Sequence, residues 1–209
     1  MGGPCFGFWF THYAPDASGH PEQTASTERF LAAERVFMAR VRSVLAGRPD
    51  LLSQLSCQPE PMEVRLHGGT QFFDWEEQVH FYGRVTHEGH GLLLELAVEQ
   101  ILSGCTGPHA ALDVVVHELM HVLDYLDGDD DGLLTGQPEA DRARFAGLRA
   151  EEQRRLAEGR SVLDPYGATN DIEFLAVLGE SFFVEPGRLK AASPGLYAVM
   201  AAYFRLSPA

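Results

Sequence analysis

Two histidines and a glutamate in the middle of the chain have a spacing that can bind a metal ion. His117, Glu118 and His121 form the pattern His-Glu-x-x-His. Residues four apart lie one turn apart on the same face of a helix, so both imidazoles can reach one ion at about 2.0–2.1 Å. A third protein ligand would leave a fourth position for water, whose pKa zinc lowers to roughly 7. Glu118 stands beside the first ligand and can accept a proton from that water.

The same residues could instead be buried histidines held by backbone or carboxylate partners. Apolar residues surround them on almost every side of the predicted helix, as in a helix buried on most sides. Two imidazoles and a carboxylate would be costly there without a role, because buried polar groups lose their hydration. Burial cost and spacing together favour a zinc site. The apolar neighbours are Val114, Val115, Val116, Leu119, Met120, Val122 and Leu123.

A second polar pattern follows further along the chain. Thr169 or Asn170 can cap a helix that carries Glu173 and, seven residues later, Glu180. Seven residues are close to two turns, so the two carboxylates share a face. A carboxylate among apolar neighbours is expected to be paired or metal-bound, which makes Glu173 a natural third ligand. The alternative is an exposed polar stripe on an amphipathic helix.

The strands and helices that the sequence predicts around these residues indicate an α+β fold. Residues 1–25 are rich in glycine and proline and have no period, which predicts a loosely ordered arm and leaves a single domain over residues 26–209. The strand just before the metal helix is expected to be a sheet edge that can hold an extended peptide by main-chain hydrogen bonds. The pattern predicts strands over 62–66, 79–85 and 92–96 and helices over 27–47, 97–102, 138–158 and 196–204.

An acidic loop follows the predicted metal helix. Asp127, Asp129, Asp131 and Gly132 match the first half of an EF-hand loop. Pro138 takes the position of the bidentate glutamate that completes such a site. We therefore interpret this segment as a solvated acidic loop that ends the helix, with calcium binding as the alternative.

The composition argues against several kinds of partner. The 209 residues are 45% hydrophobic and 22% charged, which is typical of a soluble globular protein. A formal net charge of −14 argues against nucleic acid and anionic membranes as partners, because both are negative. No apolar run is long enough to span a bilayer, and the apolar N-terminus lacks the basic region of a signal peptide. Three scattered cysteines, interpreted as reduced thiols, complete the prediction of a cytoplasmic protein.

The two polar patterns together resemble the Mlc titration factor A (MtfA) family of zinc peptidases, which is distantly related to the catalytic domain of anthrax lethal factor. The resemblance rests on residues 117–124 and 166–177, and it extends from about Gly91 to Tyr203. It implies a zincin-like α+β fold, in which a twisted mixed sheet packs on the helix that carries His-Glu-x-x-His. It also implies that His117, His121 and Glu173 bind one zinc ion per chain and that Glu118 is the general base.

Two further residues obtain roles from the resemblance. Tyr166 matches the family's tyrosine before the glutamate ligand, and it would donate its phenol to the oxyanion that forms on the scissile carbonyl. Without the resemblance, the alternative for Tyr166 is a core aromatic residue after a turn proline. Glu180 matches an acid that we expect to hold a ligand histidine by its other ring nitrogen. Gly179 replaces the serine that precedes this acid in the family.

The sequence is compatible with three functions. The first is a zinc peptidase that acts on a peptide or protein substrate. The second is a regulator-binding protein that sequesters a transcriptional repressor, such as the Mlc repressor of the family's name, with zinc serving structure or regulation. An acidic surface would suit a basic partner of this kind. The third is a hydrolase of non-peptide amides, because the pattern identifies water activation and not the substrate.

Overall fold

The computed structural model describes residues 8–13, 26–57, 62–74, 76–88, 91–103 and 113–209. Over these residues the chain is a mixed α+β structure, as the sequence predicts. It divides into two compact units, Met1–Ser43 with Pro49–Glu118, and Val44–Arg48 with Leu119–Ala209. Helix α4 (Val114–Asp124), which carries His-Glu-x-x-His, therefore begins in the first unit and ends in the second.

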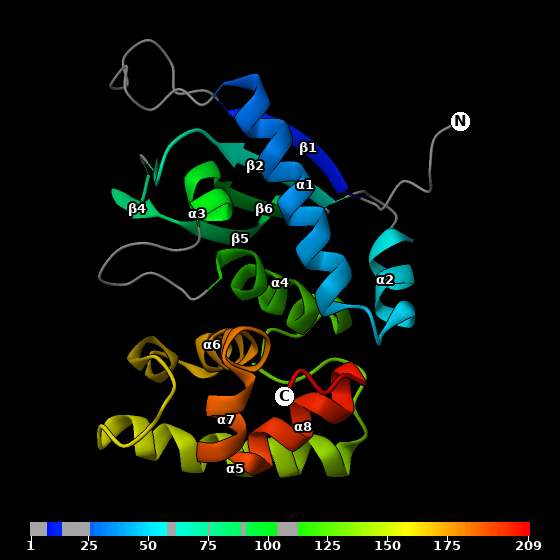
Figure 1. Cartoon of the computed structure of the whole chain (residues 1–209), viewed down its shortest axis with the longest axis vertical. Helices are drawn as coiled ribbons and strands as arrows, with labels where there is room; N and C mark the ends of the chain where they lie inside the picture. The colour runs from blue at the N-terminus through cyan, green and yellow to red at the C-terminus, as the bar shows by residue number, and fades with distance from the viewer. Residues whose placement is uncertain (1–7, 14–25, 58–61, 75, 89–90, 104–112) are drawn as a thin grey trace. The chain divides into compact units, whose positions relative to one another are not determined.

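The first unit contains a four-stranded mixed sheet (Figure 1). The strand order is β1-β2-β6-β5, in which the first three strands are parallel and β5 is antiparallel to β6. A separate antiparallel hairpin, β3 with β4, lies between β2 and β5 in the chain. The strands are β1 (Phe8–Tyr13), β2 (Met62–His67), β3 (Phe72–Asp74), β4 (Val79–Phe81), β5 (Gly83–Glu88) and β6 (Gly91–Ala97).

The edge of this sheet is not the strand that the sequence predicts. The strand before the metal helix is β6, and it pairs with β2 on one side and with β5 on the other. The prediction was wrong because the β5–β6 hairpin adds a strand outside β6, which the hydrophobic pattern does not reveal. The predicted run over 79–85 is also divided. Its first part pairs with β3 and its second part pairs with β6.

Strand β1 lies inside residues 1–25, where the sequence predicts a loosely ordered arm. It pairs in parallel with β2 along its whole length, from Phe8 opposite Met62 to the end of the strand. Phe8 and Phe10 pack edge-on against Phe37 of helix α1, with ring centroids 5.4 and 5.6 Å apart. These aromatic contacts hold the strand against the helix. Residues 1–7 and 14–25 of the predicted arm lie outside the described residues.

Helix α1 (Thr27–Val44) packs on the apolar face of the sheet and is present where the sequence predicts it (Figure 1). The sheet residues on that face include Val64, Leu66, Leu94 and Leu96, which are fully buried. Helix α3 (Val98–Ser103) follows β6 as predicted, but α2 (Pro49–Ser56) was not expected. A proline shortly after a helical run indicates the end of that helix. Here Pro49 also begins the next helix, α2, because the missing N–H of a proline costs nothing in the first turn of a helix.

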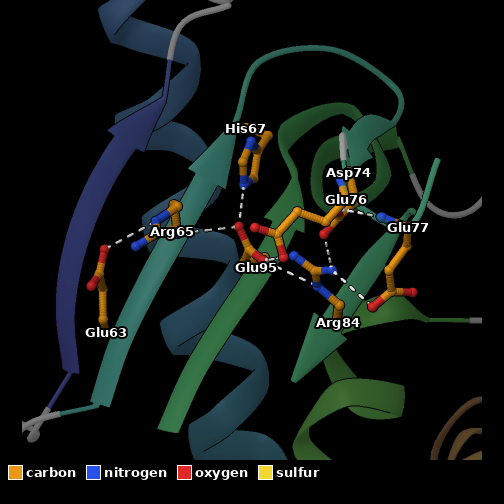
Figure 2. Close-up of polar contacts among 8 residues, drawn as sticks. All are labelled: Glu63, Arg65, His67, Asp74, Glu76, Glu77, Arg84 and Glu95. Carbon is orange, nitrogen blue, oxygen red and sulfur yellow. Dashed lines mark hydrogen bonds and ion pairs between the residues drawn. The ribbon is translucent and has the colours of Figure 1, made fainter. Parts of the chain in front are cut away.

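The opposite face of the sheet carries a network of charged side chains (Figure 2). Glu95 of β6 is buried, and its Oε1 lies 2.9 Å from His67 Nε2. Arg84 of β5 donates to Glu95 at 2.5 Å and to Asp74 of β3 at 2.5 Å. Burial by itself would raise the pKa of Glu95, but the hydrogen bonds and charges of His67 and Arg84 lower it to about 2. The ionised Glu95 and Arg84 thus join the hairpin to the sheet.

The second unit is helical over its described residues (Figure 1). Most of α6 is buried, from Phe174 to Phe182, and Phe182 packs against Tyr197 and Phe204 at centroid distances of 5.3 and 6.1 Å. No described helix in either unit combines the length and apolar character needed to cross a membrane. The helices are α5 (Glu139–Ala157), α6 (Asp171–Val184), α7 (Pro186–Ala192) and α8 (Pro194–Phe204), with 3-10 turns η2 (Tyr125–Asp127) and η3 (Pro165–Ala168).

The charged network predicts an acid-sensitive contribution to stability. The folded pKa of Glu95, about 2, lies below the ordinary value of 4.5, so its contribution is complete above about pH 4.5 and is lost as the pH falls towards 2. Glu95→Gln should lower the free energy of unfolding by about 2 kcal/mol at pH 7. Urea unfolding at pH 7, 4.5 and 3 should show the gap between wild type and variant closing with acid.

Glu63→Gln is the matched control for this measurement. Glu63 lies on the same face, but its side chain is 34% exposed, so its ion pair with Arg65 should contribute less than about 1 kcal/mol. A gap between wild type and Glu95→Gln that stayed constant from pH 7 to pH 3 would contradict the lowered pKa.

Candidate metal centre

The helix with His-Glu-x-x-His begins at a fixed point in the first unit. Asp113 precedes α4, and its Oδ1 accepts the N–H groups of Val115 and Val116 at 3.1 Å each. Its Oδ2 lies 2.6 Å from Arg40 Nη2 of α1. A carboxylate at this position satisfies free N–H groups and complements the helix dipole. Helix α1 thereby fixes the N-terminal end of α4.

Helix α4 is buried along almost its whole length. Every residue from Val114 to Asp124 is buried except His121, whose side chain is 15% exposed. His117 is 8% exposed and Glu118 is 5% exposed. Such polar side chains are tolerated inside a protein only when they bind partners. Their burial agrees with the sequence prediction of a helix enclosed on most sides.

The three residues predicted as metal ligands lie close together. His121 Nε2 is 3.6 Å from Glu173 Oε2, and His117 precedes His121 by one turn of the same helix. One ligand atom from each of the three residues lies within 4.8 Å of the other two. Within the described ranges, these are the only three His, Cys, Asp or Glu side chains that meet in this way.

The donor set of this cluster fits zinc. Two imidazole nitrogens and one carboxylate oxygen are the ligands of catalytic zinc sites that keep a fourth position open. With bonds of about 2.0–2.1 Å in tetrahedral geometry, two ligand atoms would be roughly 3.3 Å apart. The distance of 3.6 Å between His121 and Glu173 is close to that spacing. The side chain of Glu173 is 18% exposed, which does not fit an exposed polar stripe.

Glu173 is positioned by the first turn of α6. Asn170 caps this helix as predicted, because its Oδ1 accepts the N–H of Glu173 itself at 2.8 Å. Asp171 is held from α5 by Arg149 Nη2 at 2.8 Å and by Gln153 Nε2 at 2.8 Å. The start of α6 is therefore fixed both by its own cap and by two side chains of α5.

The loop after α4 is held against the same turn of α6. Gly132 has a φ of +67°, and a Cβ at this position would overlap the backbone carbonyl of Asp171. Only glycine meets both requirements, because it has no Cβ and adopts positive φ freely. Arg149 donates to the carbonyl of Gly132 at 2.7 Å. Arg149 thus contacts the loop and the α6 start together.

Asp124, the last residue of α4, holds the other end of this loop. Its buried carboxylate accepts the N–H groups of Gly132 at 2.9 Å and Leu133 at 3.2 Å. Burial raises the pKa of Asp124 to about 7, and the nearby charges of Asp130 and Asp131 add to that rise, although the two N–H groups oppose it. Asp124 is therefore a buried acid that connects the end of the metal helix to its following loop.

An arginine of α5 lies against the acidic loop and supplies positive charge to its carboxylates. Arg142 of α5 lies 2.7 Å from Asp131 and 3.8 Å from Asp127. The loop carboxylates are not among the described side chains that meet as three potential ligands. The charge of Arg142 and the loop's own hydrogen bonds agree with the interpretation of a solvated loop that ends the helix.

Tyr166 lies on the short turn η3 and is 51% exposed. Asp164 caps this turn by accepting the N–H of Tyr166 at 2.8 Å. Gly167 is buried so close to α6 that a Cβ there would lie 3.4 Å from Val177. The alternative of a core aromatic residue is therefore wrong, because half of the Tyr166 surface is open to solvent. The turn is anchored, and Tyr166 as a whole residue remains exposed on it.

Glu180 is buried in α6, on the helix face that also carries Glu173. The preceding Gly179 marks a close approach between α6 and α4. A Cβ at Gly179 would overlap the side chain of Met120. Gly179 thus leaves room for the methionine side chain of the metal helix.

Several positioning residues were not found from the sequence. Asp113 and Asp124 could have been identified from the sequence, since each is an acid at one end of an apolar helical run. Arg40 and Arg149 could not be identified in this way, because the residues that they contact are distant in the sequence. Gly83 of β5 is another such residue. A Cβ there would lie 2.6 Å from Glu118 Oε1, which brings the edge strand to the predicted base.

Comparison with known proteins places these features in context. The sequence model of a family described as glucose-regulated metallopeptidase M90 matches residues 52–205, which is more than half of the chain. The chain is also 36% identical over 101 residues to an uncharacterized protein of Synechocystis sp.. That match covers 46% of this chain and 37% of the other protein, so the chain spans well under two thirds of this relative. The family match includes every residue of the cluster.

The cluster predicts one metal-dependent increase in stability. Zinc at 100 times its dissociation constant should stabilise the protein by about 2.7 kcal/mol, which raises Tm by roughly 5–10 °C. Glu173→Ala should lose this increase, because removal of a ligand weakens zinc binding by about 100-fold or more. Thermal unfolding with and without zinc after chelator treatment measures the effect.

Glu151→Ala is the control, since Glu151 is exposed on α5 and should leave the zinc response unchanged. An equal zinc response in wild type and Glu173→Ala would show that the ion binds elsewhere.

Proposed function

The chain belongs to the family of glucose-regulated metallopeptidases M90, and on that premise we propose that it hydrolyses peptide bonds with one bound zinc ion. The resemblance to the Mlc titration factor A family is confirmed by this membership. The observation that carries the proposal is the convergence of His117, His121 and Glu173, whose ligand atoms lie within 4.8 Å of one another. A zincin-like arrangement, with a mixed sheet against the metal helix, is part of the same proposal.

The proposed chemistry assigns one task to each side chain. Zinc, when bound, would polarise the scissile carbonyl and lower the pKa of the attacking water. Glu118 accepts a proton from that water and later returns it to the leaving amine. The phenol of Tyr166 donates a hydrogen bond to the carbonyl oxygen as negative charge develops on it. Glu180 orients one of the ligand histidines.

The edge strand β5 supplies a natural support for an extended substrate. It pairs with β6 on one side, and no described strand pairs with its other side. Free N–H and C=O groups along such an edge can bind a peptide backbone by β-augmentation. Gly83, the first residue of β5, lies next to Glu118. A peptide on this edge would therefore run close to the proposed base, which favours a peptide over a small amide.

The second candidate function is binding of a transcriptional regulator. The formal net charge of −14 favours a basic partner, such as a DNA-binding domain. In this function zinc would serve structure or regulation, and Glu118 would have no essential role. The two functions differ in their dependence on turnover, so the same variants can separate them.

Glu118→Gln should keep zinc and lose peptide cleavage. Glutamine has nearly the same shape as glutamate but cannot accept the proton of the attacking water, so we expect kcat to fall by at least about 100-fold. Metal content and cleavage of a mixed peptide pool are measured on the same preparation.

His117→Ala is the comparison variant and should lose both zinc and cleavage. Near wild-type cleavage by Glu118→Gln would remove Glu118 from the mechanism. Zinc binding by the wild type without cleavage of any peptide would favour the regulator-binding function, especially if partner binding survived Glu118→Gln.

Tyr166→Phe should lower kcat by roughly 100-fold, because loss of one oxyanion donor typically costs this much. KM and zinc content should change little, since the exposed phenol is proposed to act only when charge develops on the substrate. Steady-state kinetics with a fluorogenic peptide provide the measurement. A raised KM with unchanged kcat would instead assign Tyr166 to substrate binding.

A further inference from the structure

Gly83 lies where strand β5 touches the metal helix within the first unit. By register it is opposite Leu96, so it faces the apolar side of the sheet. A Cβ at Gly83 would be 2.6 Å from Glu118 Oε1, 2.8 Å from Glu118 Cγ and 2.8 Å from Val114 Cγ2. All three distances are shorter than normal contacts between such atoms, so a side chain at position 83 would force a neighbour to move.

The backbone at Gly83 does not itself require glycine. Its φ is not among the positive values found at other glycines, such as Gly128 and Gly132. An alanine could therefore adopt the same backbone conformation. The absence of a side chain at this position is explained by space alone.

Of the two neighbours, Glu118 is the one that can yield. Val114 is buried at the first turn of α4, and its β-branched side chain is restricted to few rotamers. Glu118 has an unbranched side chain with further rotatable bonds. A Cβ at position 83 would therefore displace the carboxylate of Glu118 before it displaced the helix.

We propose that Gly83 is a positioning residue for Glu118. The space left by its missing side chain holds the carboxylate of Glu118 beside the edge strand. This inference rests on the proposed function for the role of Glu118 as base. The contact between Gly83 and Glu118 can nevertheless be tested without any substrate.

A double-mutant cycle tests the contact by thermal unfolding. Gly83→Ala should lower Tm by roughly 4 °C in the wild-type background, a shift typical of overpacking one methyl group. In the Glu118→Ala background the same substitution should lower Tm by less than half as much, because the displaced side chain is absent. Equal losses in both backgrounds would overturn the inference, since Gly83 would then serve the strand or Val114 alone.

Metal binding and turnover test the consequence for Glu118. Gly83→Ala should bind zinc within about threefold of wild type, because no proposed ligand moves. Its kcat should fall roughly 10- to 100-fold with KM little changed, as expected when a catalytic group is displaced by about 1 Å. Wild-type kcat in Gly83→Ala would overturn the positioning role, and so would loss of zinc, which would indicate damage to α4 as a whole.

Gly147→Ala is the matched control. Gly147 lies inside α5, where an added Cβ would have no neighbouring atom within 4 Å. This variant should keep zinc affinity and kcat, and its Tm should rise by roughly 2–4 °C, because alanine favours a helix interior over glycine by about 1 kcal/mol. The two proposals fail in different ways. A wild type that binds zinc and cleaves no peptide contradicts the proposed function, whereas the Tm cycle alone decides whether Gly83 and Glu118 interact.

Discussion

The central physical constraint in this protein is the cost of keeping polar side chains inside a buried helix. His117, Glu118 and Asp124 are each buried in α4, among residues that are otherwise apolar. A buried charge or imidazole is stable only with partners. Asp124 has such partners in the N–H groups of Gly132 and Leu133, and at the start of the helix Asp113 accepts two further N–H groups as a cap. A carboxylate thus binds backbone N–H groups at each end of the helix that carries the proposed chemistry.

Each part of the proposed site has its own support. In the first unit, Arg40 of α1 holds the cap Asp113, and Gly83 leaves room for Glu118. In the second unit, Arg149 of α5 contacts the α4 loop and the first turn of α6, which carries Glu173. These contacts come from α1, β5 and α5, and not only from the acidic loop that follows α4. Residues far from the ligands in the chain thus determine whether the ligands can meet.

Charges away from the site mostly serve the fold. The buried Glu95 and the partly buried Arg84 form an ion pair that joins a hairpin to the sheet, and Arg142 pairs with two aspartates of the acidic loop after α4. The EF-hand-like sequence of that loop illustrates the limit of a pattern. Its aspartates have the right spacing for half of a calcium site, but the folded chain brings an arginine to them. An acidic stretch can therefore be interpreted as a cation-binding site only when its tertiary surroundings are known.

The sequence by itself determined the features that depend on local periodicity. His117 and His121 had to share a face because the helix has 3.6 residues per turn. For a similarly local reason, Thr169 or Asn170 could be identified as the cap of Glu173's helix, and the structure assigns the cap to Asn170. Only the tertiary structure decided which strand forms the sheet edge, that residues 8–13 pair as β1, and that Gly83 meets Glu118. Strand order and shared space arise from contacts between distant segments, and no local pattern encodes which segments will meet.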